Sequence, residues 1–269
     1  MKVTLLGTGT SCGVPTIGCH CRVCRSRDPR DRRLRCVALV ETSRTRLLID
    51  CGPDIRLQLL PLEFRRIDGV LLTHEHYDHI GGIDDLRPYC RFGTIDLYGD
   101  KATLRHVRQN LPYCFPHGPA QWVESALPWL HMKLYPGVPS LSLNRVQPHE
   151  TFTIGDLDIV PIRVMHGRLP ILGYRIGRRF AYITDMKSIA PQEYTYLKGV
   201  DTLVVNALRF DTPHHSHQLV ADAVAFAKRV GARRTCLIHC NHDICLASEA
   251  PDRLPKGVEL AYDGQVIEV

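Results

Sequence analysis

The sequence predicts a single α/β domain, residues 1–269, with a functional site along one edge of layered strands. Short apolar runs rich in β-branched residues alternate with turn residues, a pattern typical of buried strands. Several of these runs end close to a histidine or an aspartate, as in α/β folds that build a site at strand ends. The composition, 44% apolar and 23% charged, is sufficient for a substantial core.

The first strand is predicted at residues 3–6, where Gly7 and Gly9 end a short apolar run. That run is too short for a signal-peptide core or a membrane span. We therefore expect a cytoplasmic protein that has no membrane partner. Eleven cysteines, an odd number in a chain without an export signal, favour reduced thiols over disulfides.

Further strands are predicted at residues 47–49, 70–72, 159–164, 180–183, 203–205 and 235–238. Five of them lead directly, or after one residue, to a side chain that can bind a metal or carry a proton. These side chains are Asp50, His74, His166, Asp185 and His239.

A helix is predicted after Ser216, which would cap its N-terminus, and Gly231 follows its last apolar position. The strand at 235–238 comes next. Residues 100–150 are rich in proline and have the weakest periodicity. They predict an insertion with irregular connections, and we place no domain boundary there.

The formal net charge is +6, which favours anionic partners without requiring nucleic acid. Seven arginines lie between Arg22 and Arg35 and could attract phosphate, although a solvated loop is the simpler explanation. The turn from Gly7 to Gly13 could present backbone amides to an anion. A tight turn without a ligand is the alternative there.

The densest motif is Thr-His-Glu-His-Tyr-Asp-His at residues 73–79, immediately after a predicted buried strand. Imidazole and carboxylate groups are ligands of zinc, manganese and iron. Because packing alone does not explain four such side chains within six residues, the motif predicts a metal centre. Its members are His74, His76, Asp78 and His79.

The pattern His-x-His-x-Asp-His resembles the signature of the metallo-β-lactamase superfamily, and later residues match its other positions in order. The resemblance implies an αββα sandwich, two mixed sheets flanked by helices. It implies that His74, His76 and His166 hold one ion, that Asp78, His79 and His239 hold a second, and that Asp185 bridges both. Asp50 would orient the ligands through hydrogen bonds. Two divalent ions, Zn or Mn, would activate a bridging water for hydrolysis.

Three thiols in Cys-His-Cys-Arg-Val-Cys resemble a segment of the phosphoribosyl 1,2-cyclic phosphate phosphodiesterases within this superfamily. The resemblance implies one structural zinc held by Cys19, Cys21, Cys24 and His242. Free thiols are the alternative. The same subfamily carries a histidine at the position of His217, which is then the candidate general acid. A polar helix start would explain His217 without catalysis.

The function that we expect is a phosphodiesterase for a small, cyclic or linear, phosphorylated substrate, with Asp185 and His217 in catalytic positions. A transfer-RNA 3′-processing endonuclease shares the metal core, so nucleic acid stays an alternative partner, although no basic, glycine-rich arm is evident. A non-catalytic binding or carrier protein on the same fold is the alternative of another class. The sequence does not define an oligomeric state, and a homodimer is one option.

Overall fold

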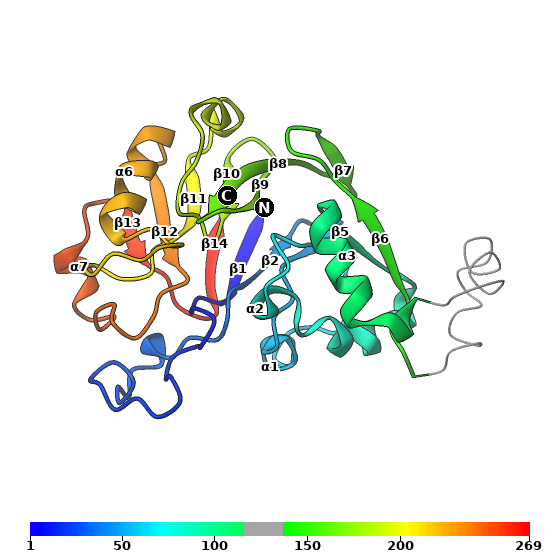
Figure 1. The fold of residues 1–269 in the computed structure, drawn as a ribbon, viewed down its shortest axis with the longest axis horizontal. Coiled ribbons are helices and arrows are strands. Elements are labelled where there is room, and N and C mark those ends of the chain that lie inside the picture. The colour runs from blue at the N-terminus through cyan, green and yellow to red at the C-terminus, as the bar shows by residue number, and fades with distance from the viewer. Residues whose placement is uncertain (116–136) are drawn as a thin grey trace.

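A computed structural model describes residues 1–115 and 137–269 of the chain. Two seven-stranded mixed sheets pack face to face, and helices cover their outer faces (Figure 1). The predicted αββα sandwich is confirmed. No helix in the described part of the chain has the length and apolar character to cross a bilayer.

The first sheet has the order β14-β1-β2-β3-β4-β5-β6. Strands β3 to β6 are parallel, so their carboxyl ends meet at one edge, while β14, β1 and β2 pair in antiparallel fashion. The bounds are β1 Lys2–Gly7, β2 Val37–Glu41, β3 Arg46–Ile49, β4 Gly69–Leu71, β5 Ile95–Gly99, β6 Leu141–Arg145 and β14 Gln265–Glu268.

The second sheet has the order β13-β12-β11-β10-β9-β8-β7. Strands β10 to β13 are parallel, and β7, β8 and β9 form an antiparallel meander beside them. The bounds are β7 Phe152–Ile154, β8 Leu157–His166, β9 Leu169–Ile176, β10 Phe180–Ile183, β11 Thr202–Asn206, β12 Arg234–Ile238 and β13 Val258–Leu260.

The helices are short and lie on the outside of the sandwich. The α-helices described are α1 Ile55–Leu59, α2 Tyr77–Ile80, α3 Lys101–Asn110, α6 Val220–Val230 and α7 Ala250–Arg253. Four 3₁₀ segments accompany them: Pro29–Asp31, Ile83–Phe92, Pro112–Cys114 and Pro191–Leu197.

Three apolar layers hold these elements together. One lies between the two sheets, one between the first sheet and α1 to α3, and one between the second sheet and α6. Burial of apolar side chains in these layers is the main stabilising contribution. In the central layer, the fully buried Tyr174 hydroxyl donates to the main-chain oxygen of Leu72 at 2.6 Å. This bond joins β9 to the residue that follows β4, two residues before His74.

The prediction that Ser216 caps a helix is wrong, because α6 begins only at Val220. The preceding residues use their backbone groups for tertiary contacts. The Ser216 carbonyl accepts from His166 Nδ1, and the Gln218 amide donates to the Met186 carbonyl. A helix through these residues would lose both contacts. The predicted end is confirmed, since Gly231 adopts φ 83° at the C-cap.

The stretch predicted to be an insertion begins with α3 and ends with β6, which pairs in register with β5. These flanking parts are regular elements of the fold. Residues 116–136 lie outside the described residues, and the insertion stays a prediction there.

Candidate active site and metal centres

The centre of the candidate site is the turn that follows β4. His74 lies in the loop after the strand, His76 precedes α2, and the single turn of α2 carries Asp78 and His79. Extended backbone at His76, with ψ 147°, changes direction before the helix begins. Alternate side chains therefore face two different positions.

Two groups of side chains form around this turn. The ligand atoms of His74, His76 and His166 lie within 4.8 Å of one another, and so do those of Asp78, His79 and His239. In the first group, His74 Nε2 is 3.0 Å from His76 Nδ1. In the second, His79 Nε2 is 3.2 Å from Asp78 Oδ2.

Asp185 lies between the two groups. Its Oδ2 is 3.1 Å from His79 Nε2, and its Oδ1 is 3.1 Å from His239 Nε2. The ligand atoms of Asp185, His74 and His79 also lie within 4.8 Å of one another. One carboxylate that faces both groups is the arrangement expected of a ligand that bridges two ions.

Hydrogen bonds fix which ring nitrogen faces the centre. His79 Nδ1 is 2.7 Å from Asp50 Oδ2, and His166 Nδ1 donates to the Ser216 carbonyl at 2.9 Å. The Thr73 hydroxyl donates to Asp50 and can accept from His74 Nδ1 at 3.0 Å. The Nε2 atoms of these three histidines are therefore free to bind a metal.

The charges of the site fit divalent cations. Burial works to raise the pKa of Asp185, but the imidazoles of His239 and His79 hold it well below its usual range. Burial lowers the pKa of His74 and of His239, which favours the neutral rings that bind a metal. His79 Nε2 is buried without a hydrogen-bond partner among the described residues and faces two carboxylates. A cation between these groups would satisfy all of them.

Three residues of the site adopt a left-handed backbone conformation that side chains other than glycine rarely occupy. They are Asp50 at φ 64°, Asp185 at φ 55° and His239 at φ 57°. Each directly follows a strand or comes one residue later, and the reversal turns its side chain into the site. Such conformations cost on the order of 1 kcal/mol each and concentrate at functional sites.

His217 also reaches the site. Its Nδ1 is 3.5 Å from Asp185 Oδ1, and its ring lies between those of His166 and His239, with centroids 4.6 and 4.8 Å away. Burial, together with the nearby His239, lowers the pKa of His217 to about 3. Because α6 starts three residues later, His217 does not lie at a helix N-terminus, contrary to the sequence expectation.

A separate group brings Cys19, Cys21, Cys24 and His242 together, with ligand atoms within 4.8 Å. His242 Nδ1 is 3.4 Å from Cys19 Sγ and 3.6 Å from Cys21 Sγ. Tetrahedral zinc with ordinary Zn–S and Zn–N bonds places these ligand atoms about 3.6 Å apart. Although burial opposes it, hydrogen bonds from the Cys24 amide and His242 lower the pKa of Cys21 to about 6, which favours the thiolate. The four residues fit a closed zinc site.

The turn from Gly7 to Gly13 contacts the site but has few free amides. The amides of Gly9, Thr10 and Gly13 donate to main-chain carbonyls. A Cβ at Gly9 would meet the Arg33 carbonyl at 2.8 Å, so this glycine is required by close packing. These contacts favour the tight-turn interpretation. The buried Thr10 hydroxyl, 3.3 Å from His239 Nε2, links the turn to the site.

The supporting partners Thr73, Thr10 and Ser216 were not identified from the sequence. Of these three residues, only Thr73 has a position in the sequence that indicates its role, because it immediately precedes the histidine motif. The Ser216 contribution is a main-chain carbonyl, which no residue type indicates.

The arginines between Arg22 and Arg35 divide into two sets. Arg33 is buried, Arg35 pairs with Asp54, and Arg22 and Arg30 pair with carboxylates. Three are exposed and form no ion pair with a described residue. These are Arg25, Arg27 and Arg32.

Known proteins resemble this chain along its whole length. Residues 45–240 match the Beta-lactamase superfamily domain. The crystal structure of a diphosphatase from the PhnP family superposes with a TM-score of 0.86 and 36% identity, covering 100% of this chain and 97% of that chain.

Two curated relatives carry different names. The Octanoyltransferase of Porphyromonas gingivalis (strain ATCC BAA-308 / W83) is 43% identical over 98% of this chain, but only 51% of that protein is covered. The Ribonuclease Z of Thermosynechococcus vestitus (strain NIES-2133 / IAM M-273 / BP-1) is 32% identical over 65% of this chain and 36% of its own length. The chain thus spans about half, or less, of these relatives.

Proposed function

This chain belongs to the metallo-β-lactamase superfamily, and from that premise we propose that it is a dinuclear metal-dependent phosphodiesterase acting on a small, cyclic or linear, ribosyl phosphodiester. The observation that carries the proposal is the convergence of seven histidine and aspartate side chains, with Asp185 facing both groups. The likeness to a PhnP-family diphosphatase supports phosphate chemistry.

In this proposal each ion has three protein ligands of its own and shares a fourth. Zinc and manganese both suit a set of imidazoles and carboxylates. When bound, two such cations supply a water of lowered pKa and stabilise negative charge on a phosphoryl oxygen. The residues that would hold them are His74, His76 and His166 for one ion, Asp78, His79 and His239 for the other, and Asp185 for both.

The chain itself keeps these ligands oriented. Asp50 accepts from His79 and from the Thr73 amide and hydroxyl, so one buried carboxylate fixes two segments of the site. Because Asp50 is fully buried, water does not compete for these bonds. A zinc ion held by the three thiols of Cys19, Cys21 and Cys24 and by His242 would connect the N-terminal loop to the segment after β12.

We assign His217 the transfer of a proton to the departing oxygen of the diester. Burial favours the neutral ring, since it lowers the pKa of His217 to about 3. A bound phosphodiester anion next to the ring would favour its protonated form. Proton transfer by a positioned histidine typically contributes about 100- to 10,000-fold to the rate.

The test of this role is His217→Ala, with His214→Ala as the matched control. The centroid of the His214 ring lies 5.0 Å from that of His217, with the ring planes tilted by 36°, but His214 belongs to none of the groups of metal-ligand atoms in the described part of the chain. We expect kcat to fall at least 100-fold in the first variant and to change little in the second, with equal metal content. Unchanged turnover in His217→Ala would remove the proton-donor role.

A second candidate is transfer-RNA 3′ processing. It is favoured by the Ribonuclease Z relative and by Arg25, Arg27 and Arg32, which have no ion-pair partner in the described part of the chain. A phosphate grip of this kind would make RNA affinity fall steeply with salt. The non-catalytic alternative requires lost ligands, and all seven positions are filled here.

Activity of the zinc- and manganese-loaded protein should be measured on a generic diester, a cyclic ribosyl phosphate, an octanoyl thioester and a precursor transfer RNA. The proposal expects hydrolysis of the first two. Cleavage of only the RNA supports the second candidate, and thioester hydrolysis alone would overturn both. About three ions per chain, two paired and one at the thiols, would agree with the proposal, and one ion would favour the non-catalytic alternative.

A further inference from the structure

The segment that carries His217 joins β11 to α6 without regular secondary structure, yet its main chain is held in place. The main-chain oxygens of Ser216, His217 and Gln218 each accept a hydrogen bond from another part of the chain. In that order, the donors are His166 Nδ1 at 2.9 Å, Lys187 Nζ at 3.2 Å and the Leu208 amide at 3.1 Å. The donors belong to the end of β8, the loop after β10 and the residues after β11, so three separate elements fix this segment.

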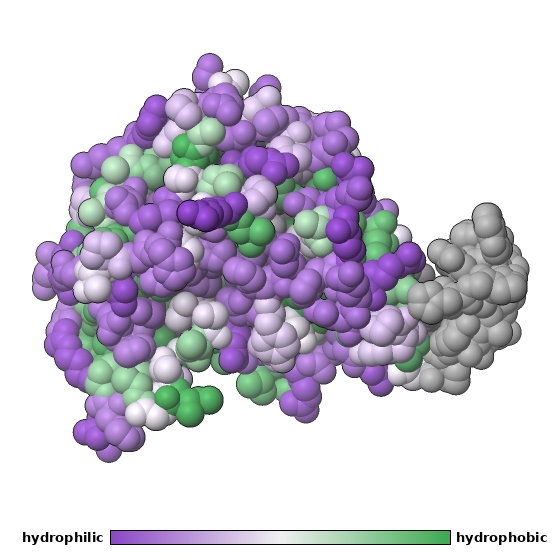
Figure 2. Space-filling model, in the orientation of Figure 1, coloured by the Kyte–Doolittle hydropathy of each residue, from purple (hydrophilic) through white to green (hydrophobic). Residues whose placement is uncertain are grey.

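Gln218 contributes two further hydrogen bonds of its own. Its amide donates to the Met186 carbonyl at 3.2 Å, and its side-chain Nε2 donates to the Asn206 carbonyl at 2.7 Å. Hydrophilic residues predominate on the face shown in Figure 2, where polar groups can bond to water, but Gln218 and Asn206 are buried. Because a buried carbonyl that loses its donor has no water to replace it, these bonds favour a single position of the segment.

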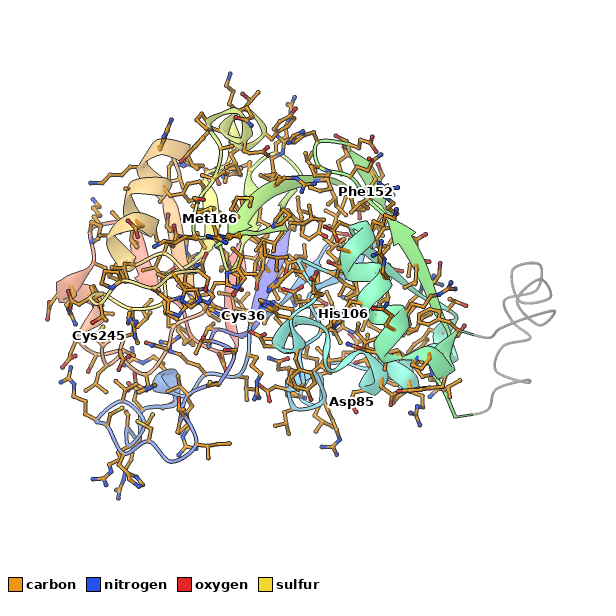
Figure 3. The ribbon with its side chains drawn as sticks, in the orientation of Figure 1. Cys36, Asp85, His106, Phe152, Met186 and Cys245 are labelled. Carbon is orange, nitrogen blue, oxygen red and sulfur yellow. The ribbon has the colours of Figure 1, made fainter. Side chains whose placement is uncertain are left out.

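Asn206 connects Gln218 to the loop that carries the bridging carboxylate. Its Oδ1 accepts from the Met186 amide at 2.9 Å, and its Nδ2 donates to the Met186 carbonyl at 3.0 Å. Met186 directly follows Asp185 in the chain. In Figure 3 the labelled Met186 lies beside α6, in the apolar layer between this helix and the second sheet. The Met186 carbonyl thus receives bonds from both Asn206 and Gln218.

This network determines how far His217 lies from Asp185. Gln218 is the chain neighbour of His217, Met186 is the chain neighbour of Asp185, and the two neighbours are hydrogen-bonded to each other. The distance of 3.5 Å between His217 Nδ1 and Asp185 Oδ1 therefore depends on the bonds of Gln218. An error of about 1 Å in the placement of a reacting group can lower a rate about 100-fold.

We propose that Gln218 is a positioning residue that holds His217 in place for proton transfer to the departing oxygen. The inference rests on the proposed phosphodiesterase function and deepens it. When water adds to phosphorus and the P–O bond to an alkoxide breaks, the departing oxygen takes a proton from the His217 ring, which later regains one from solvent. Gln218 itself neither gives nor takes a proton and acts through the main chain of the segment.

The test compares the p-nitrophenyl and methyl esters of adenosine 5′-phosphate as substrates of the metal-loaded protein. Nitrophenolate can depart without a proton, whereas an alkoxide requires one. Gln218→Met keeps the approximate size of the side chain and removes its hydrogen bonds. We expect kcat for the methyl ester to fall about 10- to 100-fold and kcat for the p-nitrophenyl ester to fall less than about threefold. A general disturbance of the site would lower both equally.

A double-mutant cycle shows whether Gln218 acts through His217. In His217→Ala, the addition of Gln218→Met should cause no further loss with the methyl ester. Lys187→Met removes one bond to the same segment at a half-buried position and should give a smaller loss, about 3- to 10-fold. This variant keeps the test open if Gln218→Met fails to fold. Gln192→Met, an identical exchange at an exposed position, is the matched control and should change neither rate.

Amide hydrogen exchange of the metal-loaded protein separates this inference from the proposed function. Peptides covering residues 207–219 should exchange about fivefold faster in Gln218→Met than in the unaltered protein, and they should be unchanged in Gln192→Met. If the unaltered protein hydrolyses neither ester, the proposed function fails while the exchange result still stands. Equal exchange in Gln218→Met, equal losses on the two esters, or a further loss in the His217→Ala background would overturn the inference.

Discussion

Two buried tyrosines, Tyr174 on β9 and Tyr182 on β10, provide a sharp test of how the two sheets are joined. They are direct partners in the β9–β10 register, and both are fully buried. The Tyr174 hydroxyl donates to the Leu72 carbonyl at 2.6 Å. The Tyr182 hydroxyl has no hydrogen-bond partner among the described residues. Phenylalanine at either position removes one oxygen and leaves the ring in place.

The expected effects have opposite directions. In Tyr174→Phe the Leu72 carbonyl stays buried without its donor, which costs about 1–3 kcal/mol of the free energy of unfolding. In Tyr182→Phe the buried hydroxyl that makes no bond is removed, so the change is near zero or stabilising by about 1 kcal/mol. The two variants should therefore differ by about 1–4 kcal/mol. Burial raises the pKa of both phenols well above the usual range, so ionisation does not enter at neutral pH.

Urea unfolding at a fixed zinc concentration is the appropriate assay, because bound metal adds to stability by mass action. Equal m-values in the three proteins are required before the free energies are compared. If the two variants are equally stable, or if Tyr182→Phe is the more damaging, the assignment of the inter-sheet bond to Tyr174 is wrong.

Three further predictions concern the site and the surface. Asp50→Asn should weaken metal binding about 10- to 100-fold in a competition titration with a chelator, because the carboxylate that orients His79 loses its charge. Gly52→Ala should lower the metal content of the paired site, since a Cβ there would overlap the main-chain oxygen of Asp78. Burial works to raise the pKa of Glu41, but its basic neighbours lower it. Its ion pairs therefore stabilise the protein above pH 4.5, and this stabilisation is lost as the pH falls further. In Glu41→Gln the free energy of unfolding, measured in urea, should therefore change less between pH 7 and pH 4 than in the unaltered protein.

Matched controls accompany these variants. Gly99→Ala should be tolerated, because a Cβ there meets Leu104 at the ordinary distance of 3.4 Å. Glu63→Gln alters an exposed carboxylate and should not change the acid sensitivity. Unaltered metal affinity in Asp50→Asn, full metal occupancy in Gly52→Ala, or an unchanged pH dependence in Glu41→Gln would each contradict the corresponding prediction.

The sequence predicted those parts of the site that lie at the ends of apolar strands. His74, His166, Asp185 and His239 each follow a run that has the length and composition of a buried strand, and for His74, Asp185 and His239 parallel neighbours bring the strand ends to one edge. The αββα architecture, which the structure confirms, was predicted because the pattern of these residues resembles the metallo-β-lactamase signature.

Other features had no such local signal. Strand β6, Leu-Ser-Leu-Asn-Arg, is half polar and only partly buried, so its composition does not separate it from a loop. The late start of α6 depends on two hydrogen bonds with distant residues. Ser216 bonds to His166, 50 positions away, and Gln218 bonds to Met186, 32 positions away. The cavity lined by Lys101, Arg105, Arg145 and Arg163 combines side chains from α3, β6 and β8, which only the tertiary structure brings together.

The left-handed backbone at Asp50, Asp185 and His239 restricts how this site could change during evolution. Among residues with a side chain, asparagine, aspartate and histidine tolerate φ near +60° best. An exchange of Asp185 for asparagine would thus keep the backbone while removing the bridging charge, whereas valine or isoleucine would strain the turn as well. Homologues that no longer bind metals should therefore retain asparagine, aspartate, histidine or glycine at these three positions. Few substitutions can then lead to a non-catalytic protein on this fold, and the residue types at the three positions identify them.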